Sequence, residues 1–146
     1  EIAHQEIETY KKQRLAEVLP RLREKGILVS LFVDPERAQL EEAAQLEADF
    51  VELHTGSYAN ADVRVRGHEL ERLIEGALHA HALGLRVNAG HGLDLENVAA
   101  VAALPHLEEL NIGHSLVARS LFVGVEAAVQ EMLARIRVSA HGEGSR

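Results

Sequence analysis

The sequence predicts an α/β protein built on a parallel sheet, because short apolar runs of strand type alternate with longer segments of helical periodicity along the chain. The runs recur at the spacing of one strand–helix unit, which favours a (β/α) barrel or a doubly wound sheet. Four such runs are too few to close an eight-stranded barrel, so we expect half of a barrel or a small open sheet.

The expected elements alternate in type from one end of the chain to the other. They are a helix over 5–25, a strand over 27–34, a helix over 35–48, a strand over 49–56, a polar loop over 57–67, a helix over 68–83, a strand and turn over 85–92, a helix over 94–105, a strand over 107–114 and helices over 115–138. We expect residues 139–146 to form a flexible tail.

Helix boundaries rest on periodicity and on capping residues. The first helix has one apolar face, and Pro20 within it is expected to kink it or move its start before Gly26 ends it. That face is made by Leu15, Val18, Leu19 and Leu22. Asp34 and Pro35 suit the N-cap and first position of the second helix.

The boundaries of the later helices also rest on periodicity and on residues that begin or end a helix. Helix 68–83 has an apolar stripe made by Leu70, Leu73, Ile74, Ala77 and Leu78. Asp94 is expected to open the helix over 94–105 and Pro105 to stop it, while Gly124 divides the last helical segment.

Composition excludes several classes of protein. The 146 residues, 47% of them hydrophobic, suit one domain or part of a larger one. Cysteine is absent, which excludes disulfides and thiol chemistry and fits a reducing compartment, so we expect a cytoplasmic protein. Net charge is −8 without a basic patch, which argues against nucleic acid. The sequence has no apolar run of roughly eighteen residues, so we expect no membrane-spanning helix. No secretory signal is visible.

Polar, glycine-rich residues gather where the expected strands end. Ligands bind at the carboxyl ends of parallel strands, and these ends read VDP, HTG, NAGHG and NIGHS. The last two share the pattern Asn-x-Gly-His, and each precedes a helix. If they end the last two strands of a barrel, Gly92, Gly113 and His114 lie where a phosphate meets backbone amides at a helix N-terminus. A glycine at such a turn can equally serve the turn alone.

Two side chains of these strand ends are candidates for proton chemistry. His91 is a candidate acid or base, because imidazole titrates near neutral pH. Glu52 and His54 alternate with apolar neighbours and share one face, where each is either functional or a structural hydrogen-bond partner. The remaining histidines suit solvated positions, and no metal-binding, dinucleotide-binding or P-loop motif is present.

Four segments together resemble the family of pyridoxine 5′-phosphate synthase, the enzyme of the deoxyxylulose-dependent vitamin B6 pathway. They are VSLFVDP, FVELHTGSYA, GLRVNAGHGLDLENV and ELNIGH, in that order, and the resemblance spans about residues 12–137. It implies a (β/α)8 TIM barrel with extra helices that condenses 3-amino-2-oxopropyl phosphate with 1-deoxy-D-xylulose 5-phosphate. The products are pyridoxine 5′-phosphate, phosphate and water. The resemblance implies no metal or organic cofactor, and a homo-oligomer, commonly an octamer.

The resemblance also implies roles for individual residues. His91 matches the proton-donor histidine and Glu52 the glutamate that stabilises the transition state, whereas Gly92, Gly113 and His114 match contacts to the aminoketone phosphate. The amino-terminal half of the family pattern is absent, so residues 1–138 are expected to be the carboxyl-terminal half of the barrel, strands five to eight. We therefore expect this chain alone to be inactive, and to dimerise or aggregate through its open edges.

Two other functions remain open on the sequence. One is another barrel enzyme acting on sugar phosphates, although a Schiff-base aldolase is disfavoured because all lysines lie in the first expected helix. The other is a non-catalytic half-barrel module that binds a phosphorylated ligand.

Overall fold

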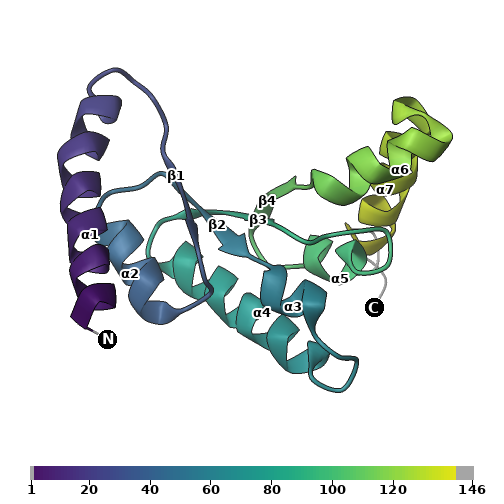
Figure 1. Ribbon diagram of the computed structural model, residues 1–146, viewed down its shortest axis with the longest axis horizontal. Coiled ribbons are helices and arrows are strands. Elements are labelled where there is room, and N and C mark those ends of the chain that lie inside the picture. The colour runs from purple at the N-terminus through teal and green to yellow at the C-terminus, as the bar shows by residue number, and fades with distance from the viewer. Residues whose placement is uncertain (1, 141–146) are drawn as a thin grey trace.

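The computed structural model describes the backbone of residues 2–140 and the side chains of residues 12–137. Its strands are β1 Ser30–Val33, β2 Phe50–His54, β3 Arg86–Gly90 and β4 Leu107–Asn111. Its helices are α1 Ile2–Arg23, α2 Arg37–Gln45, α3 Gly56–Asn60, α4 Arg66–Ala82, α5 Val98–Ala102, α6 His114–Val123 and α7 Val125–Ala140. Figure 1 shows α3 and α4 below the sheet, α1 at one end of the molecule and α6 with α7 at the other.

The four strands form one parallel sheet in the order β1-β2-β3-β4, which confirms the predicted α/β class. Neighbours in the sheet are also neighbours in the sequence, and each crossover carries at least one helix. This arrangement is that of consecutive units of a (β/α) barrel. All four carboxyl ends therefore lie along one edge of the sheet.

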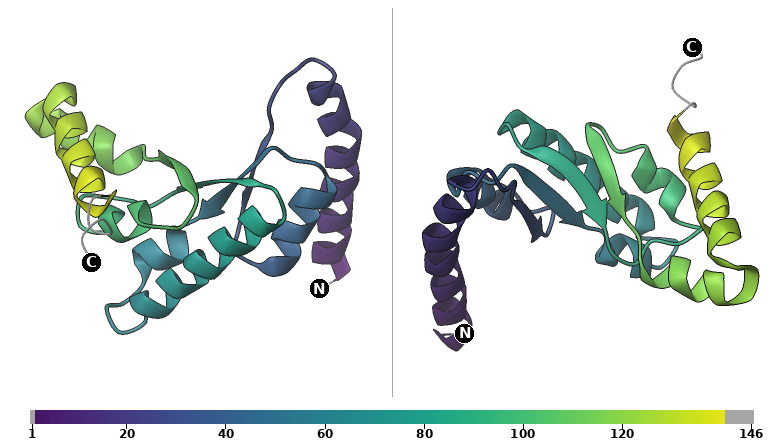
Figure 2. Two further views of the ribbon diagram at one scale, coloured as in Figure 1. Left: turned by 180° about the vertical axis from the view of Figure 1, so that it is seen from behind. Right: turned by 90° about the horizontal axis from the view of Figure 1, so that it is seen from above.

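The two faces of the sheet differ in burial. Val51 and Leu53 of β2 and Val87 of β3 are 0% exposed and pack in one core with Leu40 of α2 and Leu73 of α4. Alternate residues of β2, among them Glu52 and His54, lie on the opposite face and are only partly buried. Figure 2 shows the arrangement of the sheet and its helices from two further sides. Alternation in β2 therefore predicted correctly which side chains face away from the helices.

Several element boundaries differ from those expected. Glu36, not Asp34, is the N-cap of α2, because the Asp34 carboxylate lies against His54 instead of capping the helix. The expected polar loop over 57–67 contains most of α3. The regular helix within the segment expected over 94–105 is confined to Val98–Ala102, and Asp94 Oδ1 accepts hydrogen bonds from the Glu96 and Asn97 N–H groups in the turn that precedes it.

The terminal helices agree better with the expected pattern. α1 runs through Pro20, which lies in its last turns and does not move its start. On its expected apolar face Leu19 is 3% exposed, and Leu15, Val18 and Leu22 are partly buried. α7 extends to Ala140, and residues 141–146 of the expected tail lie outside the described residues. No described helix is long and apolar enough to span a membrane.

Candidate functional site

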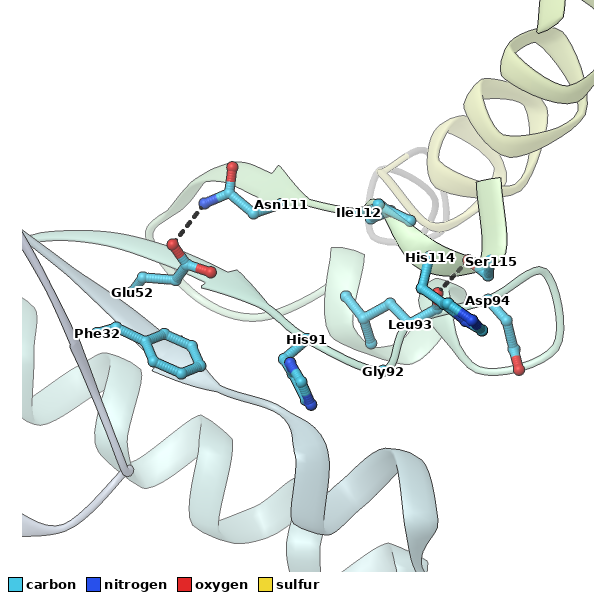
Figure 3. Close-up of a pocket in the computed structure, with 11 residues that line it drawn as sticks. Phe32, Glu52, His91, Gly92, Leu93, Asp94, Asn111, Ile112, His114 and Ser115 are labelled. Atoms are coloured by element: carbon cyan, nitrogen blue, oxygen red, sulfur yellow. Dashed lines mark hydrogen bonds between the residues drawn. The ribbon is translucent and has the colours of Figure 1, made fainter. Parts of the chain in front are cut away.

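A pocket of about 790 Å³ opens where β2, β3 and β4 end (Figure 3). All five residues expected at the site line it, namely Glu52, His91, Gly92, Gly113 and His114. Phe32, Leu93, Asp94, Asn111, Ile112 and Ser115 complete the lining. The fold thus brings together residues from three strand ends that are as many as 62 positions apart in the sequence (114 − 52 = 62).

His91 follows β3 directly and has a backbone φ of 84°, in the left-handed region that non-glycine residues rarely adopt. The buried Thr55 hydroxyl lies 2.6 Å from the Gly90 carbonyl oxygen and 2.5 Å from that of His91, so its one proton is shared between them. These contacts fix the His91 backbone to the end of β2. The His91 side chain itself is exposed at the pocket. Uncommon backbone geometry of this kind is concentrated at functional sites.

A second histidine lies beside His91. The His54 and His91 ring centroids are 5.0 Å apart with the rings edge-on, and Phe32 flanks His54, also at 5.0 Å. His54 Nδ1 lies 3.0 Å from Asp34 Oδ1, which belongs to the segment after β1. The sequence around Asp34 suits a helix cap, and only the parallel pairing of β1 with β2 reveals the contact of Asp34 with His54.

Glu52 is held by the neighbouring strands. Asn111 Nδ2 donates a hydrogen bond of 2.7 Å to Glu52 Oε2. A Cβ on Gly90 would lie 2.5 Å from Glu52 Oε1 and 2.8 Å from the Asn111 carbonyl oxygen, so glycine there makes room for the carboxylate. Asn111 and Gly90 were visible in the sequence only as members of the Asn-x-Gly-His pattern, and their link to Glu52 depends on strand pairing.

The two copies of that pattern are not equivalent in space. Asn88 pairs with Glu109 in the sheet, whereas Asn111 pairs with Gly90, so the copies are offset along their strands. Asn88 is only 5% exposed, but Asn111 lines the pocket. His91 follows a strand and His114 begins α6. The two copies of the pattern therefore occupy different places in the fold.

The pocket ends at the N-terminus of α6. Gly113 is the N-cap and His114 the first helical residue, and the Ser115 hydroxyl donates to the Leu93 carbonyl oxygen. The first N–H groups of a helix lack partners within the helix, and the helix dipole makes this end positive. An anion in the pocket would therefore meet backbone donors there, together with the exposed His114 side chain.

The described residues contain no group of three or more histidine, aspartate or glutamate side chains placed to hold a metal ion. The chemical groups at the pocket are an imidazole at the end of β3, a carboxylate held by an amide, and a helix N-terminus beside His114. Together they can transfer protons, stabilise positive charge and bind an anion.

Consecutive parallel strands with a polar pocket at their carboxyl ends define the class: part of a (β/α) barrel with its ligand site in the usual position. Residues 6–138 match the family described as pyridoxal phosphate biosynthesis protein PdxJ, and the chain belongs to that family. The resemblance inferred from the sequence motifs is thereby confirmed.

Relatives of this chain carry the name pyridoxine 5′-phosphate synthase. The protein from Opitutus terrae is 49% identical over 130 residues, which are 88% of this chain and 52% of the relative. The protein from Akkermansia muciniphila is 51% identical over 124 residues, covering 84% of this chain and 50% of the relative. One from a Synechococcus species is 54% identical over 123 residues, with the same coverage of 84% and 50%. This chain thus spans about half the length of these relatives.

Proposed function

We propose that this chain supplies the carboxyl-terminal half, strands five to eight, of the barrel of a pyridoxine 5′-phosphate synthase. The reaction condenses 3-amino-2-oxopropyl phosphate with 1-deoxy-D-xylulose 5-phosphate and releases pyridoxine 5′-phosphate, phosphate and water. The observation that carries the proposal is the convergence of Glu52, His91, Gly92, Gly113 and His114 on one pocket. Family membership and the names of the relatives support the reaction.

In this proposal each group at the pocket has a separate role. His91 transfers protons during the eliminations and ring closure, because its exposed imidazole lines the pocket and imidazole is the side chain most often used as a general acid or base. Glu52, held by Asn111, stabilises positive charge that develops in the transition state. Gly92, Gly113 and His114 bind the phosphate of the aminoketone at the N-terminus of α6.

The proposed site is incomplete within these residues. Four strands leave one face of the sheet open, and a closed barrel is what would exclude water from reactive intermediates. We therefore propose that this chain alone does not turn over its substrates. We further propose that the complete protein is a cytoplasmic homo-oligomer that acts on small phosphorylated substrates without a cofactor.

The test is an assay of product formation with both substrates. We expect no turnover by the 146-residue chain alone, and turnover when it is joined to the amino-terminal half of the Opitutus terrae relative. In the joined protein His91→Ala should lower kcat by about 10²- to 10⁴-fold, the usual contribution of a general acid or base. His68→Ala, on an exposed histidine of α4, is the matched control and should leave kcat unchanged.

Two results would contradict the proposal. Turnover by the isolated chain at an enzymatic rate would show that its four strands suffice. A joined protein in which His91→Ala weakens binding of the phosphorylated ligand but leaves kcat intact would favour a binding module instead.

A further inference from the structure

We propose that Asp34 and His54 form a positioning pair that holds the His91 imidazole in its working orientation. The inference rests on the proposed role of His91 in proton transfer. It concerns two residues at the ends of β1 and β2 that the proposed function leaves without a role.

The Asp34–His54 contact sets the state of the His54 ring. Asp34 Oδ1 lies 3.0 Å from His54 Nδ1, and an ionised carboxylate can only accept a hydrogen bond. Nδ1 therefore carries the proton that Asp34 accepts, which fixes both the tautomer and the plane of the His54 ring. The pair lies at the open edge of the sheet, with side chains 50% exposed for Asp34 and 31% exposed for His54.

Gly56 allows the two histidine rings to meet. A Cβ on Gly56 would lie 2.5 Å from His54 Nε2 and 3.2 Å from His91 Cδ2, so a side chain there would displace the His54 ring from its place beside His91. Gly56 is buried and its φ lies outside the left-handed region, so backbone conformation alone does not require glycine there. Contact between the rings does require it.

His91 depends on this packing for its orientation. Among the described residues its ring makes no hydrogen bond, and its neighbours are the rings of His54 at 5.0 Å and Phe32 at 6.4 Å. Thr55 fixes the His91 backbone but not the torsions of its side chain. An exposed imidazole without a hydrogen-bond partner is free to change rotamer unless a neighbouring side chain limits it. The His54 ring, held by Asp34, is that neighbour.

The test uses the complete, active protein with the variants Asp34→Ala, Asp34→Asn, His54→Gln and Asp34→Ala/His54→Gln. Misplacing a catalytic group by about 1 Å costs as much as 10²-fold in rate. We expect Asp34→Ala and His54→Gln each to lower kcat about 10- to 100-fold. KM for both substrates should stay within about twofold, because ground-state binding is not altered.

The remaining variants separate positioning from a general loss of structure. Asp34→Asn keeps an oxygen that can accept from His54 Nδ1, so it should retain more activity than Asp34→Ala. The double variant should be no slower than His54→Gln, because the two residues act as one unit. The matched controls Glu41→Ala and His79→Gln break a second histidine–carboxylate pair, 3.3 Å apart on α2 and α4, and should leave kcat unchanged.

A ring-nitrogen NMR measurement tests the arrangement independently of turnover. In the complete protein with ¹⁵N-labelled histidine, His54 should carry its proton on Nδ1, and Asp34→Ala should remove that preference and weaken the through-space contact between the His54 and His91 rings. If the parent protein makes no product, the proposed function fails. The NMR measurement still shows whether Asp34 holds the His54 ring against His91. The inference is overturned if Asp34→Ala leaves the tautomer and the contact unchanged, if kcat stays within about twofold in both single variants, or if their effects multiply in the double variant.

Discussion

Gly92 and Gly113 both line the pocket, but they lack side chains for different reasons. Gly92 has a φ of 74°, and a Cβ there would lie 2.8 Å from the Cβ of Ala59. The turn itself therefore requires glycine. Gly113 has a φ of −120°, and its Cβ would meet nothing within 4 Å. The four strands and their helices accept a side chain at Gly113, so packing within these residues does not require glycine there, whereas the proposed phosphate contact would.

Alanine at the two positions should affect the stability of the fold to different extents. Gly92→Ala should lower the free energy of unfolding by more than about 1 kcal/mol, because it combines a left-handed backbone with a steric clash. Gly113→Ala should change it by less than about 0.5 kcal/mol. In the complete protein, Gly113→Ala should nevertheless weaken binding of the phosphorylated aminoketone by about tenfold or more, or about 1.4 kcal/mol. Urea unfolding and ligand titration measure the two effects. Unchanged affinity in Gly113→Ala would argue against a phosphate contact there.

Tyr58 of α3 is hydrogen-bonded to Asn97, the N-cap of α5, and should make stability depend on alkaline pH. Burial raises the pKa of Tyr58 above its ordinary value of 10.0, and its hydroxyl donates to the Asn97 carbonyl oxygen at 3.0 Å. The folded state thus holds this proton more tightly than the unfolded state. The resulting stability is fully present below the unfolded pKa and is lost as pH rises through the folded one.

Tyr58→Phe tests this linkage. It should cost about 1 kcal/mol at neutral pH, because the buried Asn97 carbonyl loses its donor. The variant should also lose less stability than the parent as pH rises above 10.0, because it has no phenol to ionise at this position. Denaturant unfolding of both proteins across this range measures the difference. If the free energy of unfolding changes with pH in the same way in both proteins, ionisation of Tyr58 does not contribute to that change.

At the scale of elements, one hydrogen bond connects the start of α6 to the loop after β3. The Ser115 hydroxyl in its first turn donates to the Leu93 carbonyl oxygen in the loop after β3. This bond ties the helix N-terminus to the segment that carries His91 and Gly92. The loop and the helix therefore keep a fixed separation across the pocket.

Ser115→Ala should release this connection. We expect the affinity of the complete protein for the phosphorylated aminoketone to fall severalfold and the free energy of unfolding to fall by about 1 kcal/mol. Ser120→Ala is the matched control, because the Ser120 hydroxyl bonds to Val117 within the same helix at 2.7 Å. Calorimetric titration distinguishes the two variants. Equal affinities would mean that Ser115 does not position the binding site.

Element type was predictable from the sequence more reliably than element ends. Alternation in β2 placed Val51 and Leu53 in the core and Glu52 and His54 on the other face, because strand geometry is local. The start of α2 was not predictable from Asp34 and Pro35. A capping residue has competing partners, and His54, twenty positions further along the chain, takes the Asp34 carboxylate.

At the scale of the whole molecule, the sheet has unprotected edges. β1 and β4 are the edge strands, and neither pairs on its outer side within the described residues. Phe32 on the open face is 56% exposed, and Leu121 and Phe122 of α6 are 82% and 85% exposed. Unpaired strand edges and exposed apolar side chains both favour association between chains.

The isolated 146-residue chain should therefore self-associate. Light scattering over a series of concentrations should give a mass that rises above the monomer value. Phe32→Lys should reduce this association, because a charge on an edge strand opposes pairing with another chain. A parent chain that stays monomeric at high concentration would contradict the prediction.

The sequence by itself determined the α/β class, the order of strands and helices, and five of the eleven residues that line the pocket, because periodicity and strand-end motifs are local properties of the chain. Only the tertiary structure decided the partners of those residues: Asn111 for Glu52, Thr55 for the backbone of His91, and Asp34 for His54. The physical reason is register. Which side chains meet across parallel strands depends on the offset between strands, and this offset is set by packing over the whole sheet.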